Sequence, residues 1–123
     1  MTIQECYQQL GGDFAQAEKR LSSGTLVKRF ITKFLDDGSF AELCIAMEEG
    51  TRDKAFRAAH TLQGVSGNLS LNRLFSSASQ LTELLRSEAE VIPVGANPLF
   101  EEVKQDYQLT VSAIRAYLDA DHR

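Results

Sequence analysis

The sequence predicts an all-α protein: an antiparallel, up-and-down four-helix bundle with a short helical N-terminal extension. Three observations favour this fold class. Apolar residues recur at helical spacing along most of the 123 residues. No segment alternates apolar and polar residues convincingly, as a half-buried β-strand would. The connections between helical segments are short, and short connections place neighbouring helices antiparallel. A chain of this length forms one domain with a single core.

Residues 1–24 are predicted to form the N-terminal extension, which consists of two short helices. Gly11 and Gly12 end the first helix, and Asp13 can cap the second. Helices this short are not stable alone in water, so both are expected to pack across one end of the main body. The residues expected to face that body are Ile3, Cys6, Tyr7, Leu10, Phe14, Ala17 and Leu21.

Residues 25–121 are predicted to form the bundle. Its first segment, residues 25–49, is either one kinked helix or two nearly collinear helices, because an Asp-Asp-Gly run at residues 36–38 interrupts the apolar pattern. Ser39, with Glu42 three residues later, has the pattern of a capping box where the helix resumes.

The second helix of the bundle is predicted over residues 52–68. Thr51 can cap it directly after a glycine that ends the preceding helix, a junction so short that the chain must fold back. Ser70 is expected to cap a third helix over residues 71–85. A linker that contains proline and glycine follows, and the last helix is predicted over residues 98–119.

His60 lies on the solvent side of the helix predicted over residues 52–68. Residues advance by about 100° each in a helix, and those more than about 120° from His60 form one mostly apolar face. Because that face would be buried, the imidazole points directly away from the core. An imidazole exposed to water is largely uncharged at neutral pH and can act as a nucleophile. The residues of the apolar face are Ala55, Ala58, Leu62, Val65, Ser66 and Leu69.

Gly64 and Gly67 lie on the His60 side of the same helix. Each glycine inside a helix costs roughly 1 kcal/mol relative to alanine, so two of them indicate a compensating use. One use is clearance: without side chains, another protein can approach the imidazole and the backbone, which makes both glycines candidate docking residues. The other use, glycines that let helices of this chain pack closely, is equally compatible with the spacing.

Residues 59–69, AHTLQGVSGNL, closely resemble the signature of histidine-containing phosphotransfer (HPt) domains. In that family the pattern runs roughly Ala-His-x-Leu-Lys-Gly-x-Ser-x-x-Leu-Gly. The resemblance extends forward through residues 74–85 and back to the Glu49-Gly50 junction. Gln63 stands where the family usually has lysine, and Ser70 stands where it usually has glycine.

The resemblance implies a phosphorelay intermediate of two-component signalling. His60 would accept a phosphoryl group from a receiver-domain aspartate and pass it to another receiver. The implied partners are response-regulator receiver domains and a hybrid sensor histidine kinase. The receiver would supply the aspartate and the Mg²⁺, so the chain is expected to have no cofactor or metal site of its own. It would be a phosphoacceptor rather than an enzyme, because no kinase or ATP-binding domain fits beside the bundle.

Three neighbours of His60 are candidates for supporting roles. Gln63, one turn later, can donate amide hydrogen bonds to phosphoryl oxygens. Arg57, one turn earlier, can bring positive charge, or can simply be a solvated arginine. Phe56 lies roughly 40° from the direction of His60, so it either contacts a partner or tucks against the neighbouring helix. Docking is slightly favoured because aromatic residues are enriched at interface centres. Ser66 is expected to bond to a helix carbonyl.

Other functions find less support in the sequence. A hydrolytic or acid–base enzyme would need a second catalytic group beside His60, and no acid, cysteine or serine shares its face within a turn. A metal site in a helical bundle would use Glu-x-x-His on facing helices, and this motif does not occur. The alternative that stays open is a degenerate HPt-like bundle that docks receiver domains without phosphotransfer, because Gln63 carries no charge.

Composition argues against several partners. The net charge is −4 and no basic cluster stands out, which argues against nucleic-acid binding. No apolar run approaches the roughly 20 residues that a membrane span needs, and the start has no signal-peptide pattern. Cys6 and Cys44 are far apart at apolar positions and are predicted to be buried free thiols. These observations predict a cytoplasmic protein. His122, near a frayed C-terminus, is expected to be incidental.

Overall fold

The computed structural model describes residues 1–121, and those residues are mainly helical, with a ten-residue connection at residues 86–95, shorter connections elsewhere and no strand among them. This confirms the all-α prediction. α3 and α4 are separate, so residues 25–49 form two helices rather than one kinked helix. His122 lies outside the described residues. The helices are α1 (Ile3–Leu10), α2 (Phe14–Leu21), α3 (Gly24–Phe34), α4 (Ser39–Glu49), α5 (Arg52–Asn68), α6 (Asn72–Leu85) and α7 (Ala96–Asp121).

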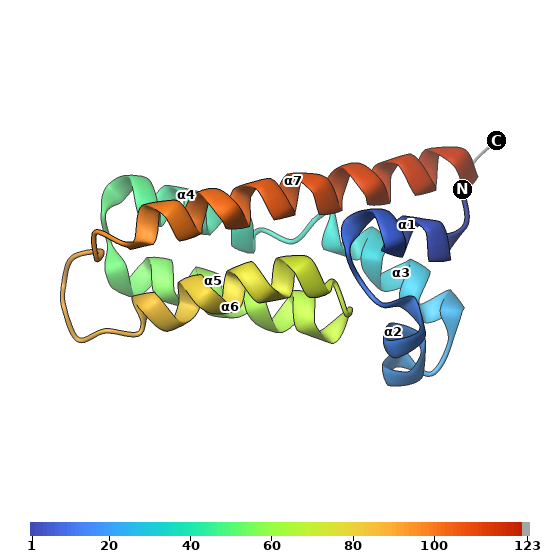
Figure 1. Ribbon diagram of the computed structural model, residues 1–123, viewed down its shortest axis with the longest axis horizontal. Helices are drawn as coiled ribbons and strands as arrows, with labels where there is room; N and C mark the ends of the chain where they lie inside the picture. Colours follow the sequence, from blue (N-terminus) through green and yellow to red (C-terminus); the bar gives the residue numbers. More distant parts are fainter. Residues whose placement is uncertain (122–123) are drawn as a thin grey trace.

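The long helix α7 runs along the molecule and joins its two ends (Figure 1). α4, α5 and α6 gather toward one end, and α1, α2 and α3 toward the other. α5 packs between α4 and α6, and α6 packs against α7. Aromatic contacts join α4 to α7: the ring of Phe40 stacks on that of Tyr107 with centroids 4.0 Å apart. α4, α5, α6 and α7 therefore share one core, with α5 in contact with two neighbours.

α1 is anchored on α7 by buried side chains. Cys6, Tyr7 and Leu10 are at most 1% exposed. The Cys6 thiol donates a hydrogen bond to the carbonyl oxygen of Ala113 at 3.5 Å, and the Tyr7 hydroxyl donates to that of Leu69 at 2.8 Å. Burial raises the pKa of the Cys6 thiol to about 11, and burial is also the main cause that raises the pKa of Tyr7. Residues 1–24 thus pack on the main body, while the division of the chain at residue 24 stays a prediction.

Two backbone hydrogen bonds tie the α1–α2 turn to the α5–α6 turn. The amide of Asp13 donates to the carbonyl oxygen of Ser70 at 3.0 Å, and the amide of Arg73 donates to that of Gly11 at 3.1 Å. A Cβ on Gly12 would lie 2.5 Å from the Ser70 carbonyl oxygen, so only glycine allows the two turns to approach this closely. The contact holds the start of α2 beside the C-terminal end of α5.

Two predicted helix caps are wrong. Ser39 is the first residue of α4 and not its cap, because the carboxylate of Asp37 accepts the Ser39 amide at 2.9 Å and Gly38 occupies the cap position. Ser70 does not cap α6, because Leu71 occupies that position. Ser70 is instead fully buried with φ at 54°, in the left-handed region that few residues other than glycine adopt.

Candidate functional site

His60 lies near the middle of α5, and its side chain is exposed. The bounds of α5, Arg52–Asn68, agree with the prediction. The opposite face of the helix is the core face, as predicted, and the Ser66 hydroxyl on it donates to the carbonyl oxygen of Leu62 at 2.7 Å. Because one face of α5 is fixed in the core, the imidazole is held on the other. The buried residues of α5 are Ala55, Ala58, Ala59, Leu62 and Ser66.

His60 lines an open hollow of about 480 Å³ on the surface. Three helices contribute to it: α5 forms the floor, α2 contributes one side chain and α6 another. The hollow therefore combines residues that are distant in the sequence around one imidazole. Its lining residues are Arg20, His60, Gln63, Gly64, Gly67, Asn68 and Phe75.

The two glycines of this face serve different purposes. Apart from its chain neighbours and its own helix backbone, a Cβ on Gly64 would meet no atom of the described residues within 4 Å, so this position leaves open surface beside the imidazole. A Cβ on Gly67 would lie 3.0 Å from two ring carbons of Phe75, so here the missing side chain allows α6 to pack on α5. Of the two uses that the sequence left open, Gly64 is compatible with clearance for a partner, and Gly67 with packing inside the chain.

Gln63 lies one turn after His60 and lines the same hollow. The side chain is half-buried, and its Oε1 atom is buried without a hydrogen-bond partner among the described residues. A buried amide oxygen without a partner costs free energy, of the order of 1–3 kcal/mol. The amide group of Gln63 is therefore not held through its oxygen by any other part of the described chain.

Phe56 contacts both His60 and a residue that the sequence analysis missed. Its ring is nearly parallel to the imidazole, with 10° between the planes and 5.8 Å between the centroids. The guanidinium carbon of Arg86, just after α6, lies 5.0 Å from the centre of the Phe56 ring. Phe56 is half-buried, so it is partly tucked between helices and partly open beside His60. It limits the positions that the imidazole can adopt on that side.

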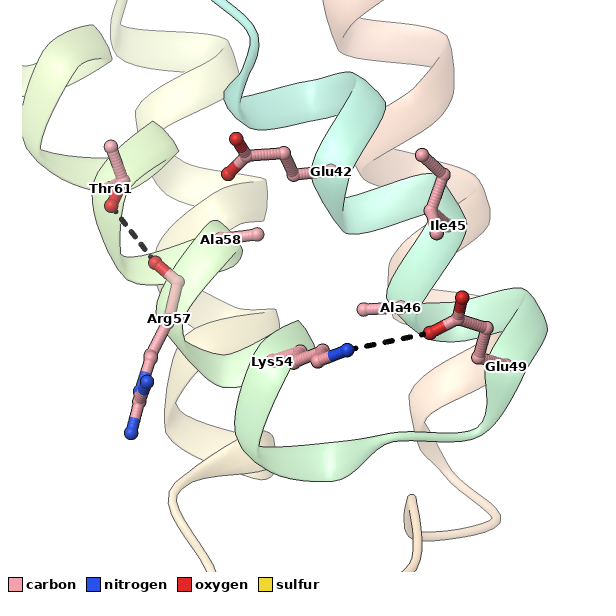
Figure 2. A pocket seen from close by; sticks show the side chains of 8 residues that line it. All are labelled: Glu42, Ile45, Ala46, Glu49, Lys54, Arg57, Ala58 and Thr61. Atoms are coloured by element: carbon pink, nitrogen blue, oxygen red, sulfur yellow. Dashed lines mark hydrogen bonds and ion pairs between the residues drawn. The ribbon is translucent and has the colours of Figure 1, made fainter.

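Arg57 is not brought into the hollow around His60. Its guanidinium forms an ion pair with Asp53 at 2.9 Å, and the side chain lines a separate groove of about 300 Å³ between α4 and α5. Figure 2 shows this groove, with Arg57 extending away from Glu42 and Glu49 of α4. The ion pair with Asp53, one turn earlier, draws the Arg57 guanidinium toward the N-terminal end of α5 and away from His60.

Arg20, which the sequence analysis did not single out, does lie in the hollow. Its Nη1 atom donates hydrogen bonds to the carbonyl oxygen of Gly67 and to the hydroxyl of Ser70, the latter at 3.1 Å. It is the one positively charged side chain among the residues that line this hollow. The only local signal was a pair of basic residues, Lys19 and Arg20, in the last turn of α2. Nothing in the sequence placed that turn beside His60.

The site thus belongs to a helical protein that presents one imidazole on an exposed helix face. Among residues 1–121, no group of three or more His, Cys, Asp or Glu side chains could hold a metal ion. No helix in that range is long and apolar enough to cross a membrane.

The family model for the Hpt domain matches residues 3–120, and the chain belongs to this family. The resemblance seen in the sequence is confirmed, and the match includes most of the segment treated as an extension. Hpt domains are phosphotransfer modules of histidine phosphorelays, in which they interact with response-regulator receiver domains. No curated protein and no solved structure matches the chain.

Proposed function

We propose that this chain is a phosphorelay intermediate in which His60 accepts a phosphoryl group from one receiver aspartate and passes it to another. The observation that carries the proposal is the exposed imidazole of His60 beside the open surface at Gly64, in a chain of the Hpt family. A partner domain can reach the imidazole without displacing any side chain at Gly64.

The transfer is a displacement at phosphorus. The Nε2 lone pair of the neutral imidazole forms the N–P bond while the P–O bond to the receiver aspartate breaks, and the carboxylate leaves with that electron pair. The ring proton on Nδ1 then passes to water. Transfer to a second receiver reverses these steps. Catalysis of such a reaction consists mainly of positioning and charge stabilisation. A Mg²⁺ held by the receiver would meet part of the phosphoryl charge, and we expect the chain to need no cofactor of its own.

The residues near His60 differ in how strongly their positions support the proposed roles. Gln63 shares the hollow and can donate its amide N–H groups to a phosphoryl oxygen, and no hydrogen bond of its oxygen within the described chain opposes this. Phe56 and Gly64 form the docking surface beside the imidazole. Gly67 contributes to this surface indirectly, because the Phe75 ring packs over it. Arg57 is the weakest candidate, because Asp53 holds it.

The proposed partners are response-regulator receiver domains and a hybrid sensor histidine kinase, which would supply the phosphate. We propose that the protein is cytoplasmic and that residues 25–121 form an antiparallel four-helix bundle in which α3 and α4 together make the first element, with residues 1–24 as an extension. The free thiols of Cys6 and Cys44 are compatible with a reducing compartment.

The test is phosphate incorporation from a phosphorylated receiver domain into the native chain and into His60→Gln. An acid-labile, base-stable phosphate in the native chain alone is the expected result. An Arg57→Ala variant tests whether Arg57 supports the phosphoryl group on His60. Unchanged phosphohistidine stability and an unchanged transfer rate would exclude this role.

The competing hypothesis is a bundle that docks receivers without accepting phosphate. It predicts no incorporation from any of several receivers that still bind the native chain. In that case Gln63→Lys, which restores the charge usual at this position, is expected to gain incorporation.

A further inference from the structure

A phosphoryl group on His60 would bring about 1.5 to 2 negative charges into the hollow. The chain already carries a net charge of −4, and Gln63 contributes no charge. A cation that contacts the phosphoryl oxygens would stabilise the modified state through charge-assisted hydrogen bonds.

We propose that Arg20 of α2 is this cation, and that the hydroxyl of Ser70 holds it in place. The proposal deepens the phosphotransfer function and rests on it. Arg20 lines the same hollow as His60 and Gln63, and it brings the positive charge among the described residues of that lining. Its guanidinium reaches the site from α2, a helix that is separate in the sequence from α5.

The hydrogen bonds of Arg20 orient its guanidinium without using all its donors. Both recorded hydrogen bonds, to Gly67 and to Ser70, come from Nη1. Within the described residues no partner is recorded for Nη2 or Nε, so these atoms can donate to a ligand in the hollow. Arginine offers five N–H donors in a planar arrangement that matches phosphate oxygens.

The conformation of Ser70 supports the same role. Its φ of 54° is unfavourable for a residue with a side chain, and glycine would adopt it at no cost. Ser70 is fully buried, its carbonyl oxygen accepts from the amide of Asp13, and its hydroxyl accepts from Arg20. The hydroxyl is what serine adds over glycine at this position. It connects the α5–α6 turn to the guanidinium.

The other nearby cations are engaged elsewhere. Arg57 pairs with Asp53 and lines the groove between α4 and α5. Arg86 lies over the Phe56 ring and pairs with Glu83 at 3.3 Å. Neither lines the hollow that contains His60.

The experiment loads His60 with potassium phosphoramidate, a small donor that needs no receiver. The imidazole forms the N–P bond, the P–N bond of phosphoramidate breaks, and ammonia leaves with the electron pair. The ¹H–¹⁵N signal of Arg20 Nε, assigned by its absence in Arg20→Gln, is followed during loading. We expect this signal to shift when His60 becomes phosphorylated, which a purely structural arginine would not show.

A second readout is the equilibrium distribution of phosphate between the loaded chain and a receiver domain. Arg20→Gln is expected to move it about three- to tenfold toward the receiver, where tenfold corresponds to about 1.4 kcal/mol. Arg20→Lys should move the phosphate toward the receiver by a smaller factor than Arg20→Gln. Ser70→Gly should also move the phosphate toward the receiver, by a smaller factor than Arg20→Gln, although glycine adopts the left-handed conformation without strain. Lys19→Gln, which removes the neighbouring charge of α2, is the matched control.

The outcomes separate this inference from the proposed function. An Arg20 signal that phosphorylation does not move, or an Arg20→Gln distribution equal to that of Lys19→Gln, overturns the role of Arg20 and leaves phosphotransfer standing. A loaded chain whose Arg20 signal shifts but which exchanges phosphate with no receiver supports Arg20 and overturns the proposed function. A native chain that phosphoramidate does not modify at His60 overturns both.

Discussion

Replacement of Gly64 by alanine is expected to stabilise the fold and to impair the site. Gly64 lies inside α5, and a Cβ there would meet no side chain of the described residues within 4 Å. The variant therefore gains the helix propensity of alanine over glycine, about 1 kcal/mol, without a clash. For a domain of this size, that gain raises the melting temperature by about 3–5 °C. The new methyl group stands beside the imidazole, so phosphate transfer from a receiver should be slower.

Gly67→Ala is the matched comparison, because the same substitution one turn later meets a side chain. The new Cβ would lie 3.0 Å from two ring carbons of Phe75, so the ring must move by a few tenths of an ångström and lose packing. Phe75 is 38% exposed and can move at moderate cost. We expect the clash to cancel the propensity gain, which leaves Gly67→Ala about 1 kcal/mol less stable than Gly64→Ala.

Urea unfolding of the two variants and the native chain, followed by circular dichroism, measures these differences. Receiver-to-chain phosphate transfer under the same conditions measures the effect on the site. Equal stability of the two variants would refute the assignment of Gly67 to internal packing. A Gly64→Ala variant that is more stable and transfers phosphate at the native rate would refute the use of Gly64 as clearance for a partner.

Three further predictions concern the rest of the molecule. Because the pKa of Cys6 rises from its ordinary value of 9.0 to about 11 on folding, the protein should lose stability as the pH rises from 9 to 11. Cys6→Ala should reduce that alkaline loss by about 2 kcal/mol in urea titrations at pH 8 and pH 11. Phe40→Ala removes the stack on Tyr107 and should lower the free energy of unfolding by about 2–4 kcal/mol. Phe40→Leu should have a stability between those of the native chain and Phe40→Ala. A loss under about 1 kcal/mol for Phe40→Ala would contradict the role of this contact. Asp53→Asn breaks an exposed pair with Arg57 and should cost under about 1 kcal/mol by the same measurement, because such pairs contribute little.

The features that the sequence predicted well are those that repeat along one helix. The bounds of α5 and the exposure of His60 follow from apolar positions that recur over several turns, so a single exception changes little. The caps at Ser39 and Ser70 were wrong because each prediction rested on a short local pattern, a capping box with Glu42 at Ser39 and a single hydroxyl at Ser70. At Ser39 the carboxylate of Asp37 took the amide, and the Ser70 hydroxyl bonds to Arg20.

The side chains around His60 could be predicted only where they belong to α5. Gln63 and Phe56 were found from the helical angle, and the structure places both beside the imidazole. Arg20 and Arg86 reach the same face from α2 and from the end of α6, and that proximity depends on tertiary packing. Periodicity within a helix carries no information about which distant turn lies against it.

The anchoring of α1 on α7 also affects the order of events during synthesis. Cys6 and its partner Ala113 are 107 residues apart, so the contact of α1 with α7 cannot form until α7 has left the ribosome. At about 5–20 residues per second, that interval lasts roughly 5–20 s. During this time the α1–α2 turn can bond to the α5–α6 turn, but α1 lacks its anchor on α7. A ribosome that stalls before α7 therefore holds a chain in which the bonds between Arg20 and the end of α5 can form, while α1 still lacks its contact with α7.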